Sequence, residues 1–334
     1  MQAARERQTT LTKPAGSLGR LEELSIQLAG ITGKPNPTIK DKVIITMAGD
    51  HGVVAEGVSA YPQEVTPQMV LNFLNGGAAI NVLARHIGAR VVVVDMGVAN
   101  EIPTTDEKLI RRRVASETMN LAKGPAMTRE QAQESIQSGI EIALDEISKG
   151  ADMIGTGDMG IGNTTPSAAI ASAILKQHPK EIAGRGTGVD DEGLRRKISV
   201  IERALEINQP NTNDGLDVLA KVGGFEIGGL AGLMIGAASK QIPVMVDGFI
   251  STAAAMIAVL LAPQCRDYLI FAHRSQEHGH GLMLEWLKLK PLLDLNMRLG
   301  EGTGAALGIS LAEAACRILN EMATFGEAGV SEKE

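Results

Sequence analysis

The sequence predicts an α/β fold built on a doubly wound, mostly parallel sheet. Short apolar runs alternate along the chain with helical patterns. The runs are continuously apolar, as expected of strands covered on both faces of a sheet. Each of them ends in Gly, Asp or His and leads into a loop. Strand–helix alternation of this kind gives parallel strands with helical crossovers, a Rossmann-like arrangement.

Five apolar runs are predicted as strands, at residues 42–50, 89–97, 151–158, 243–248 and 267–273. Helices are predicted near residues 65–86, 129–149, 165–177, 190–207, 226–240, 250–262 and 304–323. The helix at 129–149 is the clearest. Thr128 and Gln131 form a capping box, an apolar stripe follows, and Gly150 provides a stop.

The two ends of the chain depart from this alternation. Residues 17–32 form an amphipathic helical pattern with no strand pattern before residue 42, and no strand follows the last helix. We therefore expect a small helical subdomain formed by residues 1–40 plus 304–334. Residues 41–303 are expected to form the large α/β domain.

Composition excludes several classes of protein. The net charge is −7, aromatic residues make up 2%, and no basic run is longer than residues 111–113, so no nucleic-acid partner is expected. Cys265 and Cys316 lie far apart in apolar contexts and predict buried free thiols. The N-terminus lacks the apolar core of a signal peptide, and the most apolar run, 249–263, is shorter than the roughly 20 residues needed to span a bilayer. We expect a cytoplasmic protein that does not contact membranes.

Two glycine-rich loops lead into predicted helices, and the first of them follows a predicted strand. In the first, Gly157, Gly160 and Gly162 allow close backbone approach, and Thr164 or Thr165 can cap the helix that begins near Pro166. This pattern favours an anion or nucleotide loop at a helix N-terminus. The alternative is a glycine-rich turn before a capped helix, because the spacing is neither a Walker A motif nor a dinucleotide fingerprint.

The second loop covers residues 183–197. Gly184, Gly186 and Gly188 alternate around Arg185, and Lys197 lies on the following helix. The pattern alone fits an ordinary loop as well as a phosphate site. Two such loops in one chain favour phosphate binding.

Histidine and acidic residues follow two other predicted strands. His273, His278 and His280 lie near Glu277, which suggests either zinc ligands or loop hydrogen bonds. Hydrogen bonding is favoured because the chain has no HExxH pattern and no cysteine nearby. At the end of the first strand, Asp50 and His51 could serve acid–base chemistry or structure. No serine lies in a GxSxG elbow, so a hydrolase triad is not supported.

Residues 298–307 hold an acidic residue inside a third glycine-rich loop. Glu301 lies between Gly300 and Gly302, immediately before the last helix. One interpretation is a helix start in which Thr303 is the cap and Glu301 interacts with the helix dipole. That interpretation leaves the surrounding glycines unexplained.

Six motifs in order resemble the nicotinate-nucleotide–dimethylbenzimidazole phosphoribosyltransferase family, the CobT family. They are KPAGSLGRLE, GDHGV with the following EGVSAYPQEVT, GIGNTTP, the segment that begins INQPN and ends GGFEIGGLAG, DGFIS, and RLGEGTGAAL. The resemblance extends from about residue 10 to residue 323. It implies a homodimer with a large α/β domain and a small helical domain.

The resemblance also implies the reaction. Phosphoribose passes from nicotinate mononucleotide to 5,6-dimethylbenzimidazole, giving α-ribazole 5′-phosphate and nicotinate for the lower ligand of cobalamin. No metal and no organic cofactor is expected.

The family assigns roles to individual positions. Its RLGEG glutamate, here Glu301, is the general base, and an acidic residue and a lysine at Asp158 and Lys197 lie near the nucleotide. Relatives carry glutamate at the position of Asp158. Further candidates for substrate binding are Gly160, Gly162, Asn163, Thr164, Gly184, Gly186, Gly300 and Gly302, with Tyr61 and Met69 as lining of the base pocket.

Three other functions compete with this one. A nicotinate mononucleotide hydrolase could use the same loops, with water in place of the base. A non-catalytic sensor of a base or nucleoside would not need Glu301. A nicotinamide dehydrogenase is disfavoured, because no GxGxxG followed by a ribose-binding acid is evident.

Overall fold

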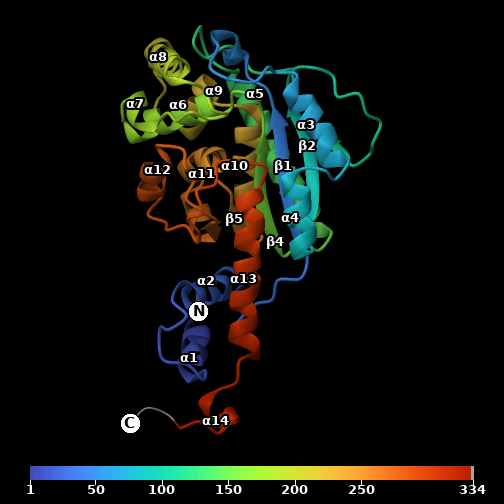
Figure 1. The fold of residues 1–334 in the computed structure, drawn as a ribbon, viewed down its shortest axis with the longest axis vertical. Coiled ribbons are helices and arrows are strands. Elements are labelled where there is room, and N and C mark those ends of the chain that lie inside the picture. The colour runs from blue at the N-terminus through green and yellow to red at the C-terminus, as the bar shows by residue number, and fades with distance from the viewer. Residues whose placement is uncertain (332–334) are drawn as a thin grey trace.

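The computed structural model describes residues 1–331 and has one parallel sheet at its centre (Figure 1). Its six strands are, in spatial order, β3 (Leu109–Arg111), β2 (Arg90–Gly97), β1 (Lys42–Gly49), β4 (Met153–Met159), β5 (Val244–Val246) and β6 (Leu269–Phe271). Every neighbouring pair is parallel, which confirms the predicted fold class. The strand order reverses between β1 and β4, and such a switch point is where doubly wound sheets bind ligands.

Helices cover both faces of the sheet. Alternate residues of β1 enter different apolar clusters, Ile45 and Met47 on one face and Ile44 on the other, as the period of two in a strand requires. One face carries α5 (Arg129–Ser148), α9 (Gly215–Val222), α10 (Phe225–Ser239) and α11 (Phe249–Leu261). The other carries α3 (Val65–Leu74), α4 (Ala79–Ile87) and α13 (Thr303–Glu321). This two-sided burial explains the continuously apolar strands.

Within residues 1–331, four further helices lie in the connections after β4 and β6. After β4 the chain forms α6 (Thr164–Leu175), α7 (Pro179–Ile182) and α8 (Asp191–Asn208). A further helix, α12 (His280–Leu287), follows β6. The helix expected over 65–86 is two helices, because Gly76 has a φ of 76° and Ala78 is extended, which separates α3 from α4.

The terminal helices pack together below the sheet in Figure 1. α1 (Gln2–Thr10) and α2 (Arg20–Thr32) contact the C-terminal half of α13, through Ala4, Ala29 and Leu319. α14 (Phe325–Ala328) follows. The N-terminal half of α13 packs on the sheet instead. The domain boundaries given above stay a prediction, and residues 332–334 of the predicted subdomain lie outside the described residues.

Two expectations from composition can be compared with the structure. Cys265 and Cys316 are both free and buried, and burial raises the pKa of each thiol to about 12. Within residues 1–331, no helix combines the length and apolarity needed to cross a membrane.

Candidate active site

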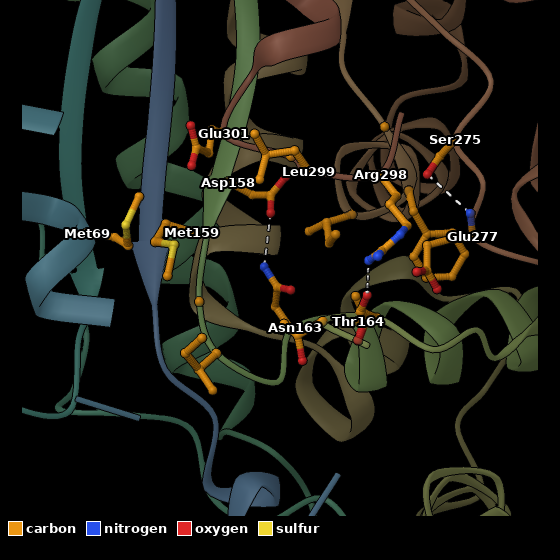
Figure 2. Close-up of a pocket in the computed structure, with 18 of the residues that line it drawn as sticks. Met69, Asp158, Met159, Asn163, Thr164, Ser275, Glu277, Arg298, Leu299 and Glu301 are labelled. Atoms are coloured by element: carbon orange, nitrogen blue, oxygen red, sulfur yellow. Dashed lines mark hydrogen bonds between the residues drawn. The ribbon is translucent and has the colours of Figure 1, made fainter. Parts of the chain in front are cut away.

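A cavity of about 520 Å³ opens at the carboxyl ends of β4, β5 and β6, beside the switch point. Segments far apart in the sequence line it. The lining residues include Tyr61, Val65, Met69, Asp158, Met159, Gly160, Ile161, Asn163, Thr164, Gly186, Gly248, His273, Ser275, Glu277, Arg298, Leu299, Gly300 and Glu301. In Figure 2, Glu301, Asp158, Met69 and Met159 lie at one end of this cavity, and Arg298, Ser275 and Glu277 lie at the other.

The Glu301 loop has a left-handed backbone over three successive residues. Gly300, Glu301 and Gly302 have φ values of 82°, 62° and 97°. Glycine adopts this conformation without strain, but glutamate does not. The surroundings hold it in place. The Glu301 N–H donates to the Asp158 carbonyl at 3.2 Å, and the Thr46 hydroxyl donates to the Glu301 carbonyl at 3.0 Å.

Asp247, at the end of β5, accepts hydrogen bonds from free amides at the start of α13. Its carboxylate accepts hydrogen bonds from the amides of Gly302 and Ala305, each at 3.1 Å. The expectation that Thr303 caps this helix is therefore wrong, because the Thr303 hydroxyl donates instead to the Gly300 carbonyl at 2.9 Å. Since Asp247 meets the free amides, the Glu301 side chain is not needed as a cap.

The Glu301 carboxylate instead faces the cavity. Its Oε2 accepts one hydrogen bond, from the Ile80 amide at 3.3 Å, and the residue is 6% exposed. Burial raises the pKa of Glu301, and the negative charge of Asp247 adds to the shift. A carboxyl group with a raised pKa is better matched to proton abstraction near neutral pH.

The surface beside Glu301 is apolar. Met69, Met159 and Leu299 lie on the same side of the cavity as Glu301 in Figure 2, and Tyr61 and Val65 also line the cavity. The role of Tyr61 and Met69 in a base pocket stays a prediction. A flat aromatic ligand could bury its faces here while its edge meets the carboxylate.

Asp158 lies at the end of β4 and lines the same end. Its Oδ2 accepts from Asn163 Nδ2 at 3.0 Å, whereas Oδ1 has no hydrogen-bond partner within the described residues. Burial raises the pKa of Asp158 well above its ordinary value, and the charge of Asp247 raises it further. The Asp158 carboxyl therefore keeps its proton to a higher pH than an exposed aspartate does.

Lys197 connects the two glycine-rich loops from behind the cavity. Its Nζ donates to the Thr164 hydroxyl at 2.6 Å and to the Gly184 carbonyl at 3.3 Å. Burial lowers the pKa of Lys197 to about 8, while nearby Glu277 opposes the shift. The two loops predicted to bind phosphate therefore converge on one buried amine.

Some of the glycines predicted to bind substrate line the cavity, and others do not. Gly160, Gly186 and Gly300 line the cavity, together with Asn163 and Thr164. Three others do not. Gly162 packs on Val54, Gly184 lines a neighbouring cavity of about 620 Å³, and Gly302 packs on Ile44.

Sequence reasoning missed several lining residues. Arg298 and Ser275 line the cavity and were not predicted, and Glu277, which was noted only beside the histidines, lines it too. Arg298 is the only lysine or arginine among the described lining residues, and it donates to the Gly186 carbonyl at 2.9 Å. Its place in the RLGEG motif was the available signal. Asp247 could have been found only from its position at the end of a strand.

The histidines do not form a metal centre. His280 accepts from the Ser275 amide at 2.8 Å and pairs with the Thr252 hydroxyl at 2.8 Å, which confirms a loop hydrogen-bonding role. His273 lines the cavity, and His278 is exposed. Over residues 1–331, no group of three potential metal-ligating side chains comes together.

Asp50 and His51 are buried but do not act as a pair. His51 Nε2 lies 2.9 Å from Glu226 Oε1, whereas Asp50 accepts from the Thr66 hydroxyl at 2.6 Å. Neither residue lines the cavity. The structural interpretation of this motif is therefore favoured.

Ligands of doubly wound sheets bind at the switch point, and here that point joins glycine-rich loops to a buried carboxylate. The protein is thus a nucleotide-binding enzyme of the α/β class. A family model described as phosphoribosyltransferase matches residues 1–330. The chain belongs to the CobT family of phosphoribosyltransferases.

Individual relatives support this assignment. The chain is 62% identical to a protein from Roseiflexus sp. strain RS-1 over 99% of this chain and 94% of the relative, and 60% identical to one from Chloroflexus aggregans with the same coverage. Both are named nicotinate-nucleotide–dimethylbenzimidazole phosphoribosyltransferase. Among solved structures, CobT from Thermus thermophilus has a TM-score of 0.96 at 49% identity and covers 99% of both chains.

Proposed function

We propose that the protein transfers phosphoribose from nicotinate mononucleotide to 5,6-dimethylbenzimidazole. The products are α-ribazole 5′-phosphate, for the lower ligand of cobalamin, and nicotinate. The observation that carries the proposal is the Glu301 carboxylate, buried with a raised pKa at the apolar end of the switch-point cavity.

The acceptor base occupies the apolar end in this proposal. One ring nitrogen of the benzimidazole attacks C1′ of the ribose, and the proton on the other ring nitrogen passes to Glu301. The bond between C1′ and the pyridine nitrogen breaks, and its electron pair neutralises the departing pyridinium as nicotinate. Attack from the face opposite the leaving group converts the β-glycoside into an α-glycoside.

The nucleotide phosphate occupies the other end. We assign its binding to Gly160, Asn163, Thr164 and Gly186, which line the cavity, and Lys197 lies behind Thr164. The phosphate is remote from the bond that breaks, so its binding supplies positioning rather than chemistry. Arg298 offers a second cation, because a guanidinium has five N–H donors and the bond to Gly186 uses one of them.

The resemblance to the family supports further proposals. The protein acts as a cytoplasmic homodimer, without metal or organic cofactor. Residues 41–303 hold both substrates, and residues 1–40 plus 304–334 form the small helical subdomain. Light scattering on purified protein tests the dimer.

Product analysis tests the reaction. The protein is incubated with nicotinate mononucleotide, with and without dimethylbenzimidazole, and the products are separated and weighed by mass spectrometry. α-Ribazole 5′-phosphate and nicotinate should appear together only when both substrates are present. Nicotinate release without the base would indicate a hydrolase, and binding without turnover would indicate a sensor.

A further inference from the structure

A buried hydroxyl connects helix α3 to the loop after β4, two segments that line the cavity. Thr66 Oγ1 donates a hydrogen bond to Asp50 Oδ1 at 2.6 Å and accepts one from the Ile161 amide at 3.1 Å. Thr66 and Asp50 are 0% exposed, and Ile161 is 4% exposed. One hydroxyl thus acts as donor and acceptor at once, which valine or alanine could not do.

The partners of Thr66 belong to different walls of the site. Thr66 lies in the first turn of α3, between Val65 and Met69, which both line the cavity. Ile161 lies in the loop after β4, next to Gly160, on the wall assigned to the nucleotide. The two walls are 95 residues apart in sequence, and Thr66 joins them directly.

Asp50 fixes this link to the sheet. Its Oδ2 accepts from the Ala99 amide at 2.8 Å, just beyond β2, and its own N–H donates to the Gly97 carbonyl at 2.9 Å. The carboxylate therefore ties the Thr66 hydroxyl to the ends of β1 and β2. Thr66 does not itself line the cavity.

We propose that Thr66 is a positioning residue that sets the distance between the acceptor wall and the nucleotide loop. The inference rests on the proposed function. Transfer requires the attacking nitrogen and C1′ about 3–3.5 Å apart, and a shift of about 1 Å can cost about 100-fold in rate. A hydroxyl that holds both walls to one carboxylate maintains that separation.

The chain offers a matched set of variants. Thr66→Val keeps the shape of the side chain and removes the hydroxyl, whereas Thr66→Ser keeps the hydroxyl. Thr118→Val serves as the control, because Thr118 is also buried, lies beside Asp50, and has a hydroxyl without a partner in the described part of the chain. Apolar contacts of Val70 and Phe73 hold α3 in the core, so Thr66→Val should still fold.

Steady-state kinetics and calorimetric titration of dimethylbenzimidazole are measured for all four proteins. Thr66→Val should lower kcat at least about 10-fold and weaken binding of the base at least about 3-fold, with the KM for nicotinate mononucleotide within about 3-fold of wild type. Thr66→Ser should restore both values, and Thr118→Val should match wild type.

Three results would overturn the proposal: wild-type kcat in Thr66→Val, equal losses in Thr66→Ser and Thr66→Val, or an equal loss in Thr118→Val. If wild type binds the base but forms no α-ribazole 5′-phosphate, the proposed function fails. The titration then still decides whether Thr66 positions the acceptor wall.

Discussion

Replacing Glu301 by glutamine removes the proposed base while changing the site least. The amide has nearly the same size, and its oxygen can still accept from the Ile80 amide. The left-handed backbone is held by main-chain bonds to Asp158 and Thr46, which the substitution leaves in place. Glu301→Gln therefore tests proton abstraction rather than architecture.

The expected loss follows from the role of the group. General-base catalysis contributes about 10²–10⁴-fold, so kcat should fall at least about 100-fold. That loss corresponds to about 2.7 kcal/mol or more of activation free energy. In the proposed function the nucleotide phosphate binds away from Glu301, so the KM for nicotinate mononucleotide should stay within about 3-fold of wild type.

The pH profile gives an independent signature. A general base acts only when deprotonated, so kcat/KM for the base should fall as pH drops through the pKa of Glu301. Burial and Asp247 raise this pKa above 4.5, which places the acid limb above that value. The part of the limb due to Glu301 should disappear in Glu301→Gln.

Stability provides the folding control. The unfolded chain releases the Glu301 proton near its ordinary pKa of 4.5, whereas the folded protein releases it at higher pH. Ionisation of Glu301 thus lowers the free energy of unfolding progressively as pH rises from about 4.5 through the raised pKa. Below about pH 4.5 the group is protonated in both states and does not change the free energy of unfolding. Glu301→Gln should melt at or above the wild-type temperature at about pH 7, with the gain absent at about pH 4.

Turnover is measured by chromatography of α-ribazole 5′-phosphate in samples quenched at set times. Melting temperatures are measured by differential scanning calorimetry. A folded Glu301→Gln protein with kcat within about 3-fold of wild type would refute the assignment of the base. An unchanged acid limb in that variant would assign the titration to another group.

The remaining predictions concern the nucleotide and the question of a metal. Alanine at Asp158 or Lys197 should raise the KM for nicotinate mononucleotide about 10-fold; a change confined to kcat would contradict a binding role. Arg298→Gln should raise the same KM, because a charge-assisted bond is lost, while Arg298→Lys keeps the charge and should lose less. Dialysis against EDTA should leave turnover unchanged, and a loss restored by zinc would return the histidines to consideration.

The sequence predicted the sheet well because its long strands are buried on both faces. Every run predicted as a strand contains one, including the three-residue β5 and β6. β3 was missed, since Leu109–Arg111 is too short to show a pattern. The break between α3 and α4 was also missed, because the apolar pattern continues across Gly76 and only the backbone changes direction.

The sequence predicted those site residues whose role can be assigned from a single motif. Glu301 could be assigned from the RLGEG motif, but the reason it is free to act could not. That reason is Asp247, which comes from β5 and takes the amides that Glu301 would otherwise cap. Thr66 gave no signal at all, because its role depends on Asp50 and on an amide 95 residues away.

Three acidic side chains lie close together in the site, and the charges of the proposed donor give a reason for this arrangement. Asp158, Asp247 and Glu301 converge from β4, β5 and the start of α13, and their mutual repulsion helps to raise the pKa of Asp158 and of Glu301. Nicotinate mononucleotide carries a pyridinium cation at C1′ and a phosphate at the other end, and the ribose becomes more positive as the bond breaks. In the proposed reaction, a cation at C1′ relieves the repulsion among the carboxylates, and Arg298 meets the phosphate from the cavity while Lys197 adds its charge from behind Thr164. The proposed reaction thus orients the donor by charge, with its reactive carbon at the end of the cavity where Glu301 is proposed to receive the proton.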